Sequence, residues 1–143
     1  MTNVIKSAYI LTVLLLYANV SQSTPLSDPR MEAESAVKSY HLALTQGDST
    51  TIKSLLAGDL LKKRMRLLDN PTYPEHLINI YNGSTIEIIK NILNNESITI
   101  EAKITLVTGS IQQRKYLLKR NEDPTSPYSY IIFSDISSDE DLF

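Results

Sequence analysis

Apolar residues after position 30 recur at intervals of three and four, which is the spacing of one face of a helix. Residues 31–46 carry such a stripe with charged side chains elsewhere, and the spacing predicts a helix there. Gly47 ends this helix, and Asp48 or Ser49 can cap a second one over residues 49–57.

Two further helical stretches follow before the pattern changes. Residues 60–68 predict a third helix, for which Asp59 can serve as the N-cap. The apolar stripe expected on this helix consists of Leu60, Leu61, Met65 and Leu68. Pro74 suits the first turn of a short helix over residues 74–81, which Gly83 stops.

After Gly83 the apolar period changes from 3.6 to two, which is typical of strands with one wet face. Residues 98–106, 111–119 and 128–134 each predict a strand. Residues 85–93 are rich in isoleucine and fit a strand, although a helix stays open as the alternative.

Helices followed by an antiparallel meander of about four strands predict one α+β domain over residues 31–136. In it the helices pack on one face of a curved antiparallel sheet. Residues 24–30 contain two prolines and predict an extended lead-in. Residues 137–143 are acidic, and we expect a disordered tail.

The start of the chain has a pattern of a different kind. Lys6 is the only charge before an apolar run over residues 8–18, and small polar residues follow. The run is shorter than the roughly 20 residues of a membrane span. It is typical of a signal peptide over residues 1–23, with cleavage after Ser23, and an uncleaved anchor stays open as the alternative. Both interpretations predict that the remaining chain works outside the cytoplasm, in the periplasm of a Gram-negative cell or otherwise as a secreted protein.

Composition excludes several classes of chemistry. The 143 residues include no cysteine, so disulfides, thiol catalysis and a lipid-modified N-terminal cysteine are excluded. With only two histidines besides, we expect no metal site and no cofactor. The formal net charge is −2, which argues against a nucleic-acid partner.

Residues 36–48 and the apolar positions after them resemble the opening of the nuclear transport factor two-like superfamily. The resemblance rests on a helix that ends in Gly47 and Asp48, followed by a short helix with small and apolar positions. Those positions are Ile52, Leu55, Leu56 and Ala57. It implies a strongly bent sheet that wraps the helices into a cone-like α+β barrel, as in the small exported bacterial members and in SnoaL-like and ketosteroid-isomerase-like proteins. Because that superfamily hosts isomerases, dehydratases, transport adaptors and secretion-machine subunits, it implies no single function.

Candidate chemistry is limited, and no catalytic residue is predicted. A site of the ketosteroid-isomerase type needs a carboxylate base, a tyrosine and a protonated acid in an apolar cone. Side chains that could supply such groups are Tyr40, Tyr73, Tyr81, His41, His76, Asp59 and Asp69, and their spacing does not show that they converge. Tyr40 lies on the stripe of the first helix, which favours core packing with a satisfied hydroxyl. The residues expected to line a cavity in the cone are Tyr40, Leu44, Met65 and Tyr81.

Two surface features point to partners. The basic side chains of the third helix form a cluster consisting of Lys62, Lys63, Arg64 and Arg66. A solvated helix face is the favoured interpretation, and a site for anionic lipid headgroups or an acidic partner is the alternative. Residues 128–133 are apolar on both faces of a strand, which indicates a strand that is covered on both sides. The resemblance to cone-fold proteins implies a homodimer through the outer face of the sheet. A central strand beneath the helices with a tyrosine-rich surface stays open as the alternative.

These patterns favour a non-enzymatic exported binding or accessory domain. It would hold an unidentified protein or a small apolar ligand in the cone or on the outer sheet face, with no membrane span after cleavage. The alternatives are a small-molecule isomerase or dehydratase of the same fold, and an assembly factor of an envelope secretion machine.

Overall fold

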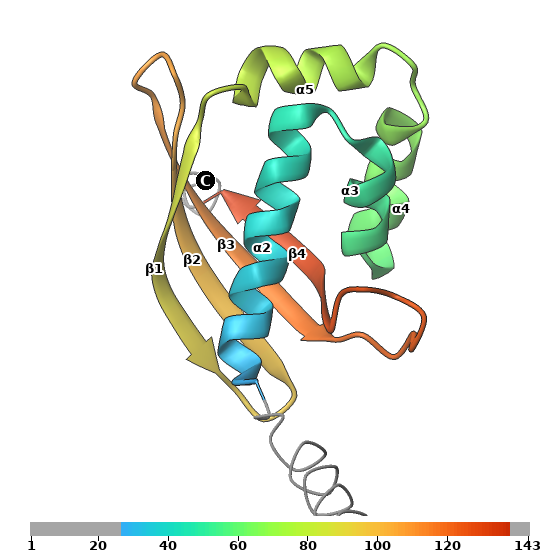
Figure 1. Ribbon diagram of the computed structural model, residues 1–143, viewed down its shortest axis with the longest axis vertical. Coiled ribbons are helices and arrows are strands. Elements are labelled where there is room, and N and C mark those ends of the chain that lie inside the picture. Colours follow the sequence, from blue (N-terminus) through green and yellow to red (C-terminus); the bar gives the residue numbers. More distant parts are fainter. Residues whose placement is uncertain (1–26, 138–143) are drawn as a thin grey trace, which may run out of the picture.

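A computed structural model describes residues 27–137 of the chain (Figure 1). Four helices precede four strands, as the change of apolar period predicts. The helices are α2 (Pro29–Gln46), α3 (Ser49–Leu55), α4 (Gly58–Leu68) and α5 (Tyr73–Tyr81). The strands are β1 (Thr85–Leu93), β2 (Ser97–Thr105), β3 (Ile111–Arg120) and β4 (Tyr130–Ser137). The fold class is therefore α+β.

The type and bounds of β1 agree with the favoured interpretation, whereas some other boundaries differ from the sequence-based expectation. β1 is a strand and not the alternative helix, because Ile86 and Ile88 alternate with exposed neighbours and pack on the core. β4 starts at Tyr130 and continues to Ser137, so the first residue of the expected tail belongs to the sheet. The rest of that tail and the expected signal peptide lie outside the described residues. Within residues 27–137, no helix combines the length and the hydropathy needed to cross a membrane.

The turn between α2 and α3 fixes how the helices meet. Gly47 has φ +63°, and a Cβ there would lie 2.6 Å from the carbonyl oxygen of Pro74 on α5, so only glycine fits. Asp48 caps α3 by accepting a hydrogen bond from the Thr51 amide at 3.0 Å. Asp59 does not cap α4 as expected, because that helix starts two residues earlier, with Ala57 at the N-cap position.

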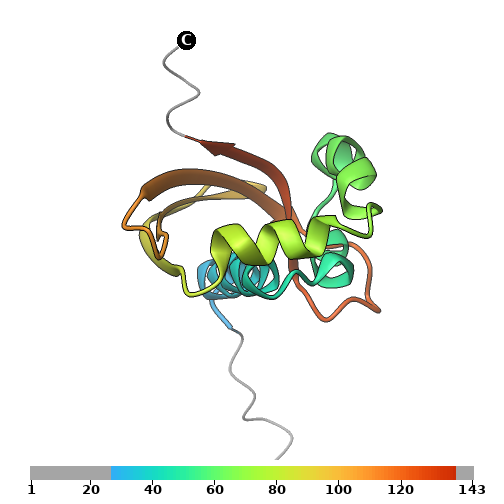
Figure 2. The same cartoon turned by 90° about the horizontal axis from the view of Figure 1, so that it is seen from above.

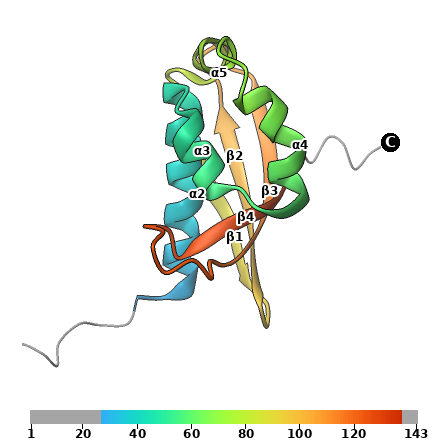
Figure 3. The same cartoon turned by 90° about the vertical axis from the view of Figure 1, so that its right-hand side faces the viewer.

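The strands form one antiparallel meander in the order β1-β2-β3-β4. The sheet curves around α2 and α5, which lie on its concave side (Figure 2). It stays open and does not form the expected barrel, because β1 and β4 do not pair with each other. Four strands are too few to close around a packed interior. A parallel bridge from Leu56 to Ile132 instead brings the link between α3 and α4 to the edge of β4. Figure 3 shows α4 on the far side of that edge from α2 and α3.

The core lies between α2 and the concave face of the sheet. On β2 every second residue is buried, and these residues are Ile98, Ile100, Ala102 and Ile104. They face the apolar stripe of α2, which includes Ala33, Val37, Tyr40 and Leu44. Each fully buried isoleucine or leucine stabilises the fold by roughly 1.5–3 kcal/mol relative to an exposed one.

Candidate functional site

A cleft lies at the end of the sheet that α4 and α5 cover. Its volume is about 240 Å³, and residues from α2, α4, α5, β2, β3 and β4 line it. Its polar lining residues are Tyr40, Arg64, Tyr73, His76, Tyr81, Arg114, Tyr116 and Asp135. Its apolar lining residues are Leu44, Leu67, Leu77, Ile80 and Ile104. We call this site the Asp135 cleft.

Asp135 is the centre of the polar cluster, and its side chain is only 2% exposed. Its Oδ1 atom accepts a hydrogen bond from Arg114 Nε at 2.8 Å, and Arg114 Nη2 lies 2.6 Å from the same oxygen. Its Oδ2 atom accepts from Arg64 Nη2 at 2.9 Å and from the Tyr40 hydroxyl at 3.3 Å. Arg64 Nη1 also donates to the Tyr40 hydroxyl. The carboxylate therefore has donors at both oxygens and is tied to two guanidinium groups.

A β-bulge turns Asp135 into the cleft. On β3, Tyr116 and Leu118 are both buried on the concave face, and their partners on β4 are Asp135 and Ile132. Those partners are three residues apart and not two, because the register shifts by one residue at Phe133. A regular strand would send Asp135 to the opposite face from Ile132, so the extra residue re-aims the carboxylate.

The two arginines come from regular positions of their elements. Arg64 lies one helical turn after Leu60 and one before Leu68, on the face of α4 that packs on the domain. Arg114 precedes Tyr116 by two residues on β3 and therefore shares its face of the sheet. Tyr40 packs edge-on against Tyr116, with ring centroids 6.1 Å apart.

Burial governs the protonation of the cleft. It raises the pKa of Tyr40 well above its ordinary value, and it also raises the pKa of Tyr81 and Tyr116. All three hydroxyls are therefore protonated and neutral near pH 7. Burial acts to lower the pKa of Arg114, but the charge of Asp135, the hydrogen bond to it and the neighbouring Tyr116 and Tyr81 together outweigh burial, and the pKa is raised overall. Two charged guanidinium groups thus face one carboxylate, which leaves one positive charge in excess among the lining residues.

The residues expected to line a cavity do so with one exception. Tyr40, Leu44 and Tyr81 line the cleft, whereas Met65 is not among its lining residues and is 36% exposed. The face of α4 that packs on the rest of the domain is centred on Arg64 and not on Met65. The observed face therefore differs by one residue from the apolar stripe expected for this helix. Arg64 is likewise a correction to the basic cluster, since its side chain turns inward to Asp135.

The rest of the basic cluster lies on the surface. Lys62, Lys63 and Arg66 are exposed, and Lys62 has an exposed contact with Asp59 at 3.7 Å. Such pairs contribute little to stability. Whether these three side chains bind an anionic partner stays a prediction.

Of the remaining candidates for acid–base chemistry, Tyr73 and His76 line the cleft, whereas His41, Asp59 and Asp69 are not among its lining residues. Asp69 pairs with Lys53 at 2.5 Å, away from the cleft lining. His41 is 6% exposed and its Nε2 atom lies 3.2 Å from the Ser84 hydroxyl, so it joins α2 to the start of β1. His76 stacks on Tyr73 at the rim, with ring centroids 6.0 Å apart. In the part of the chain with described coordinates, no group of three or more His, Cys, Asp or Glu side chains is placed to hold a metal ion.

Sequence reasoning missed Arg114 and Asp135. A signal for Arg114 was present, because it alternates in phase with Tyr116 and Leu118. For Asp135 the simple alternation pointed the other way, since Ile132 and Asp135 fall out of phase in a regular strand.

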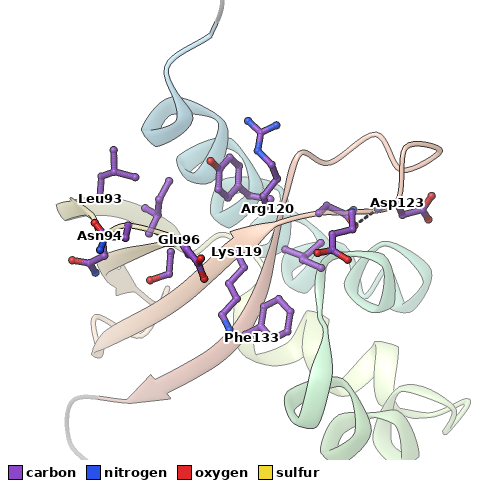
Figure 4. A pocket seen from close by; sticks show the side chains of 14 residues that line it. Leu93, Asn94, Glu96, Lys119, Arg120, Asp123 and Phe133 are labelled. Carbon is purple, nitrogen blue, oxygen red and sulfur yellow. Dashed lines mark hydrogen bonds between the residues drawn. The ribbon is translucent and has the colours of Figure 1, made fainter.

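A second and larger hollow, of about 740 Å³, lies at the opposite end of the strands. The turn between β1 and β2, the end of β3 and the start of β4 line it, and we call it the far groove (Figure 4). Lys119 lies over the Phe133 ring at 5.0 Å, and Arg120 lies over the Tyr130 ring at 5.7 Å. Figure 4 shows that Lys119 and Arg120 point to opposite sides of β3. These two cations therefore do not converge on a common point.

Comparisons with known proteins give a partial similarity. The chain is 31% identical over 111 residues to a thermosome subunit of Pyrococcus horikoshii and, equally, to a thermosome subunit of Pyrococcus abyssi. Each alignment covers 68% of this chain and 20% of the relative, so the chain spans about a fifth of the length of these proteins. No family model matches the chain. No solved structure matches it either.

Proposed function

We propose that this chain is a non-catalytic binding domain that works outside the cytoplasm and holds a small molecule in the Asp135 cleft. The observation that carries the proposal is the convergence of one carboxylate, two guanidinium groups and four tyrosines in a hollow with apolar walls. Concave sites with mostly apolar linings and a few converging polar groups are typical of small-molecule binding. The modest volume of the cleft favours a ligand about the size of one ring.

The contacts of Asp135 favour binding over catalysis. A general base needs a free lone pair within hydrogen-bond reach of the substrate. Both oxygens of Asp135 already accept hydrogen bonds from Arg64, Arg114 or Tyr40. The carboxylate is therefore suited to hold the two arginines in place, and an isomerase of the ketosteroid type has no free acid in this cleft.

The thermosome relatives do not supply a second candidate function. The chain spans only about a fifth of their length. The resemblance to the nuclear transport factor two-like superfamily stays a proposal that rests on the Gly47–Asp48 turn and on the bent sheet.

The binding proposal is tested by closing the cleft. Leu67 lines its mouth and is 47% exposed, so Leu67→Trp fills the mouth without disturbing the core. Leu93→Trp is the matched control, because Leu93 is 52% exposed and lines the far groove. We expect small ring compounds such as benzyl alcohol to shift NMR signals of cleft residues in the wild type and in Leu93→Trp, and not in Leu67→Trp. Shifts that centre on the far groove, or none in the wild type, would overturn the proposal.

The location is tested separately by expressing the chain with residues 1–23 in a bacterium that has a periplasm. We expect the protein in the periplasmic fraction, with a mass that corresponds to cleavage after Ser23. Protein that keeps these residues in the cytoplasmic fraction would contradict the proposed location without touching the binding proposal.

A further inference from the structure

We infer that the Asp135 cleft selects a small carboxylate with an apolar body over a neutral molecule of the same shape. The inference rests on the proposed function and deepens it by naming the chemical class of the ligand. It depends on three features of the cleft, which are its excess charge, its unused donors and the position of its apolar walls.

Among residues 27–137, the charge of the cleft is positive and is not balanced within it. Arg64 and Arg114 face a single acid, Asp135, and no other acidic side chain of these described residues lines the cleft. Arg64 and Arg114 are 26% and 19% exposed, whereas Asp135 is almost fully buried behind them. A ligand that enters the cleft therefore meets the guanidinium groups, and a single negative charge on it would balance the site.

Both arginines keep donors that Asp135 does not use. A guanidinium group carries five N–H donors in a planar fork. Arg64 spends two of them on Tyr40 and Asp135, and Arg114 directs its Nε and Nη2 atoms to Asp135. The Arg64 Nε atom has no acceptor among the described residues, and Arg114 also contacts the Tyr116 hydroxyl as a hydrogen-bond donor. A carboxylate is the group that pairs most strongly with such N–H donors, through charge-assisted and often bidentate hydrogen bonds.

The tyrosines and apolar residues favour the rest of such a ligand. Because burial raises the pKa of Tyr81, its hydroxyl is neutral and does not repel an anion. Leu67 and Ile80 lie at the outer part of the cleft, at 47% and 36% exposure, and offer apolar contacts to a ring. A carboxylate directed at the arginines would leave the apolar body of the ligand in contact with these two exposed side chains.

The test compares benzoate with benzyl alcohol, which has the same ring and no charge. Both probes are titrated into the ¹⁵N-labelled full chain, and chemical shifts give the site and the dissociation constants. We expect benzoate to bind in the Asp135 cleft at least about tenfold more tightly than benzyl alcohol. Equal affinity of both probes in the cleft would overturn the carboxylate inference and leave the proposed function standing. If neither probe shifts the NMR signals of the cleft residues, both the carboxylate inference and the proposed function fail.

A variant assigns the effect to the excess charge. Arg64→Gln leaves Arg114 and Asp135 as a neutral pair, so we expect benzoate to lose its advantage while benzyl alcohol binds as before. Arg120→Gln, in the far groove, is the matched control and should change neither probe. If Arg64→Gln does not fold, the salt dependence of probe binding to the wild-type protein provides the test instead. Added NaCl should then weaken benzoate binding and spare benzyl alcohol, and a benzoate affinity that salt does not change would overturn the inference.

Discussion

The two ends of the sheet carry similar side chains in opposite arrangements. In the Asp135 cleft, Arg64 and Arg114 are mostly buried and converge on one carboxylate. In the far groove, Lys119 and Arg120 are exposed and diverge to opposite sides of β3. The far groove is about three times larger than the cleft. Convergence and burial, and not the size of the hollow, therefore distinguish the candidate site.

The difference has a physical cause in the solvent exposure of the charges. Ion pairs on the surface contribute little, because water and salt screen them. A buried carboxylate with two guanidinium partners is screened much less, and removing one partner leaves a charge without compensation. Four substitutions or titrations test this contrast, from the largest expected effect to the smallest.

The largest effect is expected from Asp135→Asn. It removes the shared counter-charge of Arg64 and Arg114, and we expect the free energy of unfolding to fall by about 3 kcal/mol. Glu122→Gln in the far groove is the matched control and should change it by no more than about 0.5 kcal/mol. Urea denaturation followed by circular dichroism measures both. Equal losses in the two variants would remove the contrast between the two ends.

Tyr40→Phe keeps the ring packing against Tyr116 and removes only the hydroxyl that connects Arg64 with Asp135. We expect a loss of about 1–2 kcal/mol in the free energy of unfolding. Tyr130→Phe is its counterpart in the far groove, because the Tyr130 hydroxyl has no hydrogen-bond partner among the described residues. The free energy of unfolding of that variant should stay within about 0.5 kcal/mol of the wild-type value. A larger loss for Tyr130→Phe than for Tyr40→Phe would contradict the assignment.

Lowering the pH should destabilise the cleft half of the molecule through His41. Burial lowers the pKa of His41 below its ordinary value of 6.5, so the folded protein keeps the imidazole neutral where the unfolded chain is protonated. Stability is therefore complete above about pH 6.5 and falls as the pH drops through and below that value. We expect the urea midpoint to decrease from pH 7.5 to pH 5.5.

The titration has a matched pair of variants. His41→Gln should abolish most of this dependence, and His76→Gln, at the exposed rim, should retain it. A dependence that survives in His41→Gln and disappears in His76→Gln would show that the buried histidine is not its source.

The smallest effect is expected in the far groove. Lys119→Gln and Arg120→Gln each remove one cation that lies over an aromatic ring. We expect each substitution to lower the free energy of unfolding by about 0.5 kcal/mol, since such contacts are weak where water reaches the cation. Thermal or urea unfolding measures the change, and a loss comparable to that of Asp135→Asn would make the far groove an equal candidate.

The elements were predictable because their signal is local. Helical spacing before Gly83 and alternation after it predict the order of helices and strands that the structure has. The face that α4 buries was less predictable, because Leu60, Leu61 and Leu68 fit stripes centred on Arg64 or on Met65. Only the packing of α4 beside β4 selects Arg64.

The sequence by itself determined the α+β order, the end of the first helix at Gly47 and the exclusion of thiol chemistry. These follow from apolar period, helix-ending residues and composition, which do not depend on distant contacts. The tertiary structure alone decided that Arg64, Arg114 and Asp135 meet. Asp135 faces the cleft only because a bulge at Phe133 changes the phase of β4, and the two arginines reach it from separate elements. The charge that defines the candidate site is thus a property of the folded sheet, and no stretch of the sequence contains it.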